Sequence, residues 1–269
     1  MLVFPNAKIN IGLDIVEKRA DGYHNIASCF YPVGWSDALE ITLDKEFSFQ
    51  SDGIGIPGNA SDNLCIKAYQ MIAANYPLPP VKIHLLKSIP IGAGLGGGSA
   101  DAAFAIKALN QLFNLKISFE KQLDYARRLG SDCAFFIPNK PAYCFQKGDM
   151  FEDIDLSLKG KWIVLVNPGL HISTADAYSG IIPKRSEHDL RTVLREPISD
   201  WKHKVKNDFE ATLFPKYPLL EEIKGALYNQ GALYAAMSGS GSTLFGIFDL
   251  EKDLTKHFAE FAVWQGLLD

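Results

Sequence analysis

The stretch PIGAGLGGGSA, from Pro90 to Ala100, decides how this chain is interpreted, because it places five glycines within nine positions. It lies between a predicted strand and a predicted helix. The first turn of a helix has unpaired backbone N–H groups and the positive end of the helix dipole, so it attracts anions. Glycines before such a helix permit positive φ angles and let the backbone approach a bulky polyphosphate. The stretch therefore predicts a phosphate-binding loop.

Neither of the two familiar phosphate loops fits this stretch. The Walker loop G-x-x-x-x-G-K-[ST] requires a lysine that does not follow these glycines. Gly92, Gly94 and Gly97 spell G-x-G-x-x-G, as in dinucleotide-binding proteins. However, no βαβ unit with a distal acidic residue follows them, and Asp101 falls inside the next predicted helix. A glycine-rich loop alone is also compatible with a flexible connector.

Length and composition indicate a soluble globular protein. The 269 residues suit one large or two modest domains, with 47% hydrophobic and 22% charged residues. A formal net charge of −4 argues against a nucleic-acid-binding protein, which usually has a basic surface. The N-terminal MLVFPNAK does not resemble a signal peptide, and no apolar run approaches the roughly 20 residues of a membrane span. We expect a cytoplasmic protein without nucleic-acid or membrane partners, as a monomer or weak homodimer.

The four cysteines, Cys29, Cys65, Cys133 and Cys144, lie far apart and form no C-x-x-C pair. The six histidines show no H-E-x-x-H or paired spacing. A structural zinc site or a disulfide framework is therefore not expected, and no metal ligand is assigned. The cysteines are interpreted as buried thiols in a reducing compartment.

Hydrophobic periodicity predicts strands and helices in both halves of the chain. In the first half, strands are expected over residues 7–15, 27–32, 38–43, 81–85 and 142–146. Helices are expected from about Asp62, from near Ser99, and from Ser118 to just before Gly130. In the second half, strands over residues 161–166, 232–237 and 243–248 accompany helices over 173–178, 187–195, 207–213 and 218–229. A terminal helix and a short strand follow, and this order suggests a ferredoxin-like half.

Three motifs carry a family resemblance: NAKIN at residues 6–10, the glycine loop, and MSGSG at residues 237–241. Their order and spacing over nearly the whole chain resemble the GHMP superfamily of small-molecule kinases (galactokinase, homoserine kinase, mevalonate kinase and phosphomevalonate kinase). The resemblance implies an α+β fold with two domains. Residues 1–155 would form a ribosomal-protein-S5-like, ATP-binding domain, and residues 156–269 a ferredoxin-like, substrate-side domain. It also implies ATP and Mg²⁺ as cofactors.

The segment KRADGYH, residues 18–24, narrows the resemblance. It is similar to a signature of the branch that phosphorylates the C2 hydroxyl of a diphosphocytidyl derivative of methylerythritol, in the non-mevalonate route to isoprenoids. GSD at residues 130–132 and NDFE at residues 207–210 agree with that branch. Ala100 departs from it, because many relatives have a second Ser there, and Ser99 is then the only loop hydroxyl. Tyr178 departs as well, because relatives often have Phe. The implied partner is a small-molecule cytidine diphosphate substrate.

Lys8 and Asp132 are the predicted catalytic residues. By themselves, Lys8 fits a solvated strand lysine, and Asp132 fits a cap or loop residue at the edge of a predicted apolar strand. The resemblance implies that Asp132 accepts the proton of the attacking hydroxyl and that Lys8 keeps this carboxylate ionised. Because strand side chains alternate, Asn10 shares a face with Lys8. Asn10 is therefore a candidate contact for the hydroxyl or a phosphate.

The other predicted contacts with the substrate follow from the resemblance. Tyr23 and Tyr178 are expected to stack on the two faces of the cytosine, and His24 to bond its polar edge. Turn-flanking residues such as Tyr23 and His24 otherwise need no ligand. Further substrate contacts are predicted at Thr174, Gly239, Ser240 and Gly241. The glycines among them would admit a diphosphate, although the same residues also fit a plain hairpin turn.

Predicted contacts with ATP extend beyond the loop to three other positions. Asn63, Leu64 and Lys87 match family positions near the adenine and ribose, although an Asn at a helix start is usually only a cap. The predicted loop contacts are Pro90, Ile91, Gly92, Ala93, Gly94, Leu95, Gly96, Gly97, Gly98, Ser99 and Ala100.

Two other functions fit these residues less well. The acceptor substrates of homoserine and mevalonate kinases contain no nucleobase that Tyr23 and His24 could bind. A catalytically inactive relative that only binds ligand has no need of Lys8 and Asp132. An assay of ATP turnover with and without the cytidine substrate separates the three functions.

Overall fold

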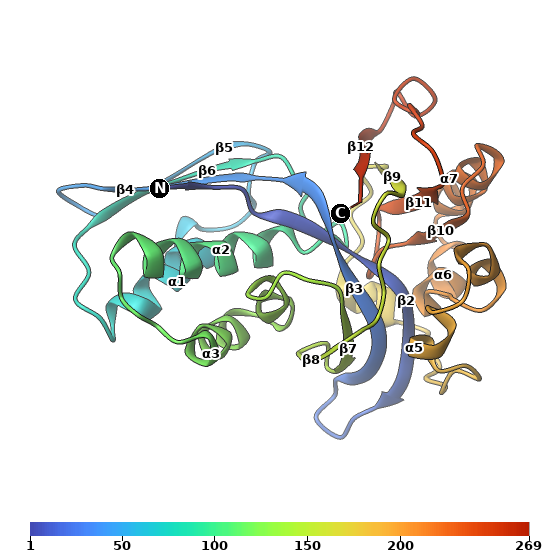
Figure 1. Cartoon of the computed structure of the whole chain (residues 1–269), viewed down its shortest axis with the longest axis horizontal. Helices are drawn as coiled ribbons and strands as arrows, with labels where there is room; N and C mark the ends of the chain where they lie inside the picture. Colours follow the sequence, from blue (N-terminus) through green and yellow to red (C-terminus); the bar gives the residue numbers. More distant parts are fainter. Residues whose placement is uncertain (269) are drawn as a thin grey trace. The chain divides into compact units, whose positions relative to one another are not determined.

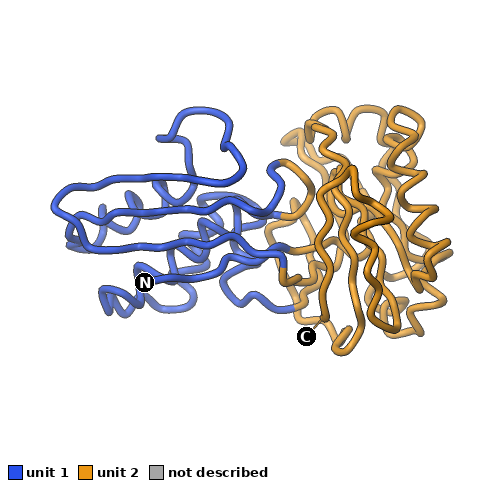
Figure 2. Tube along the Cα trace, turned by 90° about the horizontal axis from the view of Figure 1, so that it is seen from above, with its two compact units in different colours: residues 1–7, 35–91, 96–140 blue, residues 8–34, 92–95, 141–269 orange. Residues whose placement is uncertain are grey.

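The computed structural model describes residues 1–268, and they divide into two compact units (Figure 2). Unit 1 contains residues 1–7, 35–91 and 96–140; unit 2 contains residues 8–34, 92–95 and the chain from residue 141 onward. The predicted boundary at residue 155 assumes two consecutive segments, whereas these units interleave. They do so because residues 8–34 form a sheet with residues 142–153 of the same unit.

Unit 1 contains a four-stranded sheet in the order β1-β4-β6-β5 (Figure 1). The strands are β1 (Leu2–Val3), β4 (Ala38–Leu43), β5 (Ser48–Gly53) and β6 (Val81–Lys87). β5 and β6 are parallel, and the other pairs are antiparallel. Every second side chain of β6 is buried, at Val81, Ile83, Leu85 and Lys87, as expected for a strand with one face on the core.

Three helices complete unit 1: α1 (Leu64–Ala73), α2 (Gly97–Leu112) and α3 (Phe119–Leu129). Ser118 caps α3 by accepting a hydrogen bond from Lys121 N, and the helix ends at Gly130, as predicted. α2 begins two residues before the predicted Ser99, and its buried face is rich in alanine. Two short 3-10 helices, η1 (Ala60–Asp62) and η2 (Ser131–Phe136), flank these elements. The strand predicted after Asp132 is therefore wrong.

Unit 2 is built mainly on two antiparallel sheets, in the orders β2-β3-β7-β8 and β10-β11-β9-β12. The first comprises β2 (Asn6–Lys18), β3 (His24–Ser36), β7 (Ala142–Gln146) and β8 (Met150–Asp153), of which residues 6–7 and 35–36 belong to unit 1. The second comprises β9 (Trp162–Asn167), β10 (Tyr234–Met237), β11 (Leu244–Phe248) and β12 (Ala262–Leu267).

The helices of unit 2 are short except for the last. They are α4 (Thr174–Tyr178), α5 (Leu190–Val193), η3 (Ile198–His203), α6 (Asp208–Leu213) and α7 (Pro218–Asn229). A shared core joins α4, α6 and α7 to both sheets, with Leu13 of β2, Val166 of β9 and Leu227 of α7 among its members. No helix within residues 1–268 has the length and apolar character that a membrane span requires.

The predicted terminal helix is absent from unit 2, where residues 251–261 form turns and bends before β12. Leu254 and Phe258 are buried and four residues apart, which produces a helix-like pattern. Their backbones form one i,i+4 hydrogen bond, from Phe258 N to Leu254 O, and Phe261 N then bonds Phe258 O. A single turn satisfies the apolar pattern without a regular helix.

Candidate active site

The middle of the glycine loop, residues 92–95, is bonded to the MSGSG turn within unit 2. Ser238 Oγ donates to Gly94 O at 2.8 Å, and Thr243 N donates to Ala93 O at 3.3 Å. Gly94 has a φ of 78°, and a Cβ atom at this position would lie 2.0 Å from Ser238 O. Only glycine fits there. Two glycine motifs that lie far apart in the sequence therefore form one connected structure.

Lys8 and Asn10 of β2 are part of the same structure. Lys8 Nζ donates to Asn10 Oδ1 and, at 3.3 Å, to Gly94 O. Asn10 N donates to Ser238 Oγ at 3.1 Å. The Lys8 ammonium also lies 4.4 Å from the centroid of the Phe30 ring, a cation–π contact. Both polar side chains are buried, so these contacts offset the cost of removing them from water.

Ser28 of β3, which no sequence motif singled out, completes this polar cluster. Its hydroxyl accepts from Asn10 Nδ2 at 2.9 Å and donates to Gly12 O at 2.6 Å. Ser28 is fully buried. It is a polar residue on the buried face of a strand, and that face is the signal that could have identified it.

The NDFE motif holds the MSGSG turn in place, a role that the sequence did not reveal. Asn207 Nδ2 donates to Met237 O at 2.7 Å and to Gly239 O at 2.8 Å. Glu210 Oε1 accepts from Met237 N at 2.8 Å. Gly239 packs against the glycine loop, and an added Cβ would lie 3.2 Å from Gly94 Cα. Of the other predicted turn residues, Ser240 is half-buried and Gly241 is buried.

Asp132 lies in unit 1, in the first turn of η2, next to the start of α2. It is half-buried, and Ser131 Oγ donates to its Oδ1 at 3.3 Å. The neighbouring Cys133 thiol forms a hydrogen bond with the side chain of Ser99, in the first turn of α2. Burial raises the pKa of this thiol to about 11, so it stays protonated. Unit 1 thus brings the GSD segment to the first turn of the glycine-loop helix.

The three residues predicted near the adenine and ribose have structural partners in unit 1. Asn63 caps α1, with Oδ1 accepting from Cys65 N at 2.9 Å, and Leu64 is the partly buried first residue of that helix. Lys87 is buried with its ammonium between two carboxylates. Contact of Asn63 and Leu64 with a nucleotide stays a prediction, whereas the buried Lys87 ammonium is already bound by two carboxylates.

Aromatic rings predicted to bind cytosine lie in unit 2. The His24 ring stacks on the Tyr178 ring, with centroids 4.6 Å apart and an interplanar angle of 18°. Phe209 of the NDFE motif meets Tyr178 edge-on at 4.9 Å. Burial and Lys18 lower the pKa of His24, which favours its neutral imidazole. A base that stacks on the same face of Tyr178 has to displace His24.

Tyr23 and Thr174 are exposed at the surface of unit 2. The Tyr23 side chain is 62% exposed, and Lys147 Nζ lies 5.2 Å from its ring centroid. Thr174 begins α4, which is capped by the Ser173 side chain. These positions leave both residues accessible to a ligand.

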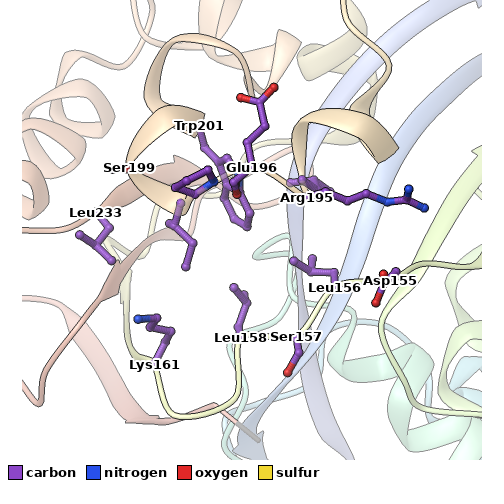
Figure 3. A pocket seen from close by; sticks show the side chains of 13 residues that line it. Asp155, Leu156, Ser157, Leu158, Lys161, Arg195, Glu196, Ser199, Trp201 and Leu233 are labelled. Atoms are coloured by element: carbon purple, nitrogen blue, oxygen red, sulfur yellow. The ribbon is translucent and has the colours of Figure 1, made fainter.

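A separate hollow of about 680 Å³ in unit 2 involves none of the predicted residues (Figure 3). Apolar Leu158 and Trp201 line it beside Lys161 and Glu196. Lys161 is paired with Asp249 at 2.5 Å, and Glu196 with Lys204. These pairs compensate the charges of Lys161 and Glu196. Asp155 and Arg195 also line the hollow, so its charges are of both signs and single out no class of ligand.

Two family models match the chain: "GHMP kinases N terminal domain" over residues 63–139 and "GHMP kinases C terminal" over residues 192–259. Together with the mixed sheets and helices, they confirm the predicted two-domain α+β fold. The predicted boundary at residue 155 lies between the two matched segments and stays a prediction.

Similar proteins cover almost the whole chain. A 4-diphosphocytidyl-2-C-methyl-D-erythritol kinase of Cytophaga hutchinsonii is 52% identical over 254 residues, 94% of each chain. One of Bacteroides fragilis is 53% identical over 260 residues, 95% of each. A crystal structure of 4-(cytidine 5'-diphospho)-2C-methyl-D-erythritol kinase has a TM-score of 0.85 at 28% identity, over 100% of this chain and 99% of that one. The mevalonate kinase of Methanococcus jannaschii, at 16% identity and a TM-score of 0.70, shares the fold over 100% of this chain and 98% of its own.

Proposed function

Because the chain belongs to the 4-diphosphocytidyl-2-C-methyl-D-erythritol kinases of the GHMP family, we propose that it phosphorylates the C2 hydroxyl of 4-diphosphocytidyl-2-C-methyl-D-erythritol with ATP. The observation that carries this proposal is identity of about half the residues over 94% or more of the chain. It is supported by the clustering of Lys8, Asn10 and Ser238 around Gly94. The products are the 2-phosphate and ADP, in the non-mevalonate route to isoprenoid precursors.

The proposed reaction is a direct transfer between two oxygen atoms. The substrate hydroxyl oxygen forms a bond to the γ-phosphorus, and the bond from that phosphorus to the β,γ-bridging oxygen breaks. The hydroxyl proton passes to the Asp132 carboxylate, and ADP leaves. Free N–H groups in the first turn of α2, which begins at Gly97, bind the phosphate oxygens of ATP.

Lys8 is proposed to stabilise negative charge during this transfer. Its hydrogen bonds to Asn10 Oδ1 and Gly94 O fix the direction of a long, flexible side chain. A fixed ammonium keeps the catalytic carboxylate ionised and stabilises charge that develops on the attacking oxygen.

The cytosine is proposed to bind between the rings of Tyr23 and Tyr178, with His24 bonding its polar edge. If the cytosine takes the face of Tyr178 on which the His24 ring lies, that ring has to move away. Thr174 and the turn formed by Gly239, Ser240 and Gly241 bind the rest of the substrate, including its diphosphate. The Asn207 hydrogen bonds keep that turn rigid before the substrate arrives.

Mg²⁺ is proposed to enter with ATP. Residues 1–268 contain no group of three or more His, Cys, Asp or Glu side chains arranged to hold a metal ion. Mg²⁺ commonly keeps several waters and is held through substrate phosphates, so a protein cage is not required. Ser99, in the first turn of α2, would supply the protein hydroxyl near the metal or the phosphates. When bound, Mg²⁺ neutralises charge on the β- and γ-phosphates.

We place the protein in the cytoplasm, acting on a small molecule without nucleic-acid or membrane partners. A formal net charge of −4 fits this proposal. A monomer or a weak homodimer stays the expectation.

The test compares ADP release with four acceptor alcohols. We expect release with the diphosphocytidyl substrate and little with methylerythritol phosphate, homoserine or mevalonate. Mass spectrometry and ³¹P NMR of the product place the new phosphate at C2. Equal turnover of methylerythritol phosphate would refute recognition of the base, and ADP release without any acceptor would refute the kinase assignment.

A further inference from the structure

Unit 1 contains a buried cluster of three charged side chains: Lys87, Asp37 and Asp101. Lys87 Nζ donates to Asp37 Oδ2 and, at 2.9 Å, to Asp101 Oδ2. All three residues are at most 4% exposed. Burying charges is costly unless they are paired and hydrogen-bonded, and here one ammonium serves two buried carboxyl groups. Such a costly arrangement calls for an explanation beyond stability alone.

Asp37 fixes the segment that leads into the glycine loop. Its Oδ1 accepts from Ser88 N at 2.6 Å and from Ile89 N at 2.8 Å, while its Oδ2 binds Lys87. The three residues that precede Pro90 are thus held by one carboxylate. Asp37 itself is anchored through Asp37 N, which donates to Pro5 O at 2.9 Å.

Asp101 and Gly97 bring the same ammonium to the far end of the loop. Asp101 lies on α2, one turn after Gly97. A Cβ atom on Gly97 would lie 3.1 Å from Lys87 Nζ and 2.9 Å from Ile89 Cγ2. The ammonium therefore lies against the turn whose backbone N–H groups point toward the loop. One cluster holds residues 87–89 and 97–101, the two ends of the glycine loop.

The Lys87 ammonium itself has no room for a nucleotide. Its side chain is 3% exposed, and two carboxylates already bind it. Burial lowers the pKa of Lys87, but Asp101 and Asp37 raise it more, so the ammonium stays charged. Any contribution of this side chain to ATP binding must therefore act through the loop.

We propose that Lys87, Asp37 and Asp101 are positioning residues that hold both ends of the glycine loop in the geometry that binds the ATP phosphates. The inference rests on the proposed function, in which the loop binds ATP. Anion binding by backbone N–H groups depends on their direction. Loosening either end of the loop should therefore weaken ATP binding and leave the affinity for the cytidine substrate unchanged. The hydrogen bond between Lys87 and Asp101 is the link that carries this effect.

Two substitutions at one position test this link. Asp101→Ala removes the acceptor for Lys87 but leaves the Lys87–Asp37 pair, so one ammonium still faces one carboxylate. Asp101→Asn is also neutral at this position but keeps an oxygen that accepts from Lys87. Asp101 Oδ1 is buried without a hydrogen-bond partner in the described chain, so the single amide oxygen of Asn is enough to replace the hydrogen bond that Oδ2 accepts from Lys87. We expect Asp101→Ala to raise the KM for ATP roughly tenfold and Asp101→Asn to stay within about twofold of wild type.

Three controls accompany these variants: the KM for the cytidine substrate, the thermal midpoint of unfolding, and a substitution at a different lysine. Lys107→Met changes the lysine of α2, which donates to Phe136 O at 3.3 Å instead of binding the loop ends. It should leave the KM for ATP unchanged. The proposal is overturned if Asp101→Ala leaves ATP binding intact, if Asp101→Asn is as weak as Asp101→Ala, or if both substrates weaken equally.

A second measurement separates this inference from the proposed function. Calorimetry with a non-hydrolysable ATP analogue reports the affinity of the loop without any acceptor. If the wild type phosphorylates a different alcohol, the proposed function fails, while the calorimetric difference between the two Asp101 variants still decides the inference. Lys87→Met combined with Asp101→Asn adds a check: stability is expected to recover relative to Lys87→Met alone, and the affinity for the analogue is not. Recovery of both would overturn the proposal.

Discussion

Gly94 and Gly98 lie four residues apart in the glycine loop, but the fold requires only one of them. An added Cβ on Gly94 would lie 2.0 Å from the backbone oxygen of Ser238, and its φ is 78°. An added Cβ on Gly98 meets nothing within 4 Å, and the residue is exposed. The fold itself thus explains the glycine at 94, whereas no neighbouring atom among the described residues requires the one at 98.

The same distinction divides the rest of the candidate site. The contacts of Asn207, Lys87 and Ser28 are accounted for inside the protein. Tyr23 is a large aromatic residue left 62% exposed, which folding does not require. Substitutions in the first group should reduce stability, and those in the second group should reduce binding or turnover alone. Five substitutions test this division.

Asp132→Asn is expected to have the largest effect, and on turnover only. Asn keeps an acceptor for the Ser131 hydroxyl, so the fold should tolerate it. Loss of a general base costs roughly 100- to 10,000-fold in rate. Steady-state kinetics should show this loss in kcat with both KM values near wild type. A variant with half the wild-type kcat would contradict the role of Asp132 as the base.

Gly94→Ala is expected to have the largest effect on stability. An L-residue in the left-handed region costs about 1–2 kcal/mol, and the close approach to Ser238 adds roughly 1–3 kcal/mol of overpacking. Urea unfolding of the variant and wild type measures the difference. An unchanged free energy of unfolding would mean that the fold tolerates a side chain at residue 94, as it is expected to do at residue 98.

Tyr23→Ala is expected to weaken the cytidine substrate while leaving stability and the KM for ATP unchanged. Stacking on one aromatic ring contributes about 1–3 kcal/mol, or roughly five- to 150-fold in affinity. Phe119→Ala, at an aromatic residue 49% exposed on α3, is the matched control and should change neither KM. Tyr178→Phe should be nearly neutral, because the ring and not the hydroxyl stacks. Normal substrate affinity in Tyr23→Ala would refute the base-stacking role.

Gly98→Val is expected to raise the KM for ATP about tenfold without loss of stability. Valine has open space at this position and is slightly better than glycine within a helix. The added side chain would nevertheless block the close approach of phosphates to the backbone. Gly225→Val, at an exposed and equally open glycine of α7, controls for the helix. A fall in the melting temperature of Gly98→Val alone would mean that the fold does require this glycine.

Asp101→Asn is expected to have the smallest effect, visible as a change in how stability depends on pH. Burial raises the pKa of Asp101 from 3.8 to about 7; Lys87 opposes this shift, Asp37 adds to it, and Cys65 lies nearby. Between these two pH values the folded state retains a proton that the unfolded state has lost. The free energy of unfolding therefore falls as pH rises from about 4 to about 7. The variant should lack this fall. If urea titrations give wild type and variant the same change in the free energy of unfolding between pH 5 and pH 8, the shift is contradicted.

Elements with a local signal in the sequence were predicted well. α3 has a Ser cap and a Gly stop, and β6 alternates strictly, so neither depends on distant residues. The strand predicted after Asp132 was wrong, because a short apolar run is compatible with both a strand and a 3-10 helix. The predicted terminal helix was also wrong, because a single turn is enough to bury Leu254 and Phe258, which lie four residues apart.

The partners of the site residues depend on distant parts of the chain. Alternation along β6 places Lys87 on the buried face, but nothing near it in the sequence indicates Asp37, 50 residues earlier. Asn207 likewise bonds the carbonyl groups of Met237 and Gly239, about 30 residues later. The motifs were identifiable, whereas the contacts that hold them required the folded structure.

The interleaving of the two units also governs how the chain folds as it leaves the ribosome. The last segment of unit 1 ends at Lys140, so all of this unit is available while the second half is still being translated. Strands β2 and β3 are made among the first residues, yet the core that buries Leu13 and Ile15 includes residues of α7 and β11. During synthesis these strands keep an uncovered apolar face for more than a hundred residues of chain growth. A gene fragment that ends at residue 155 would leave that face uncovered permanently, and its product would aggregate.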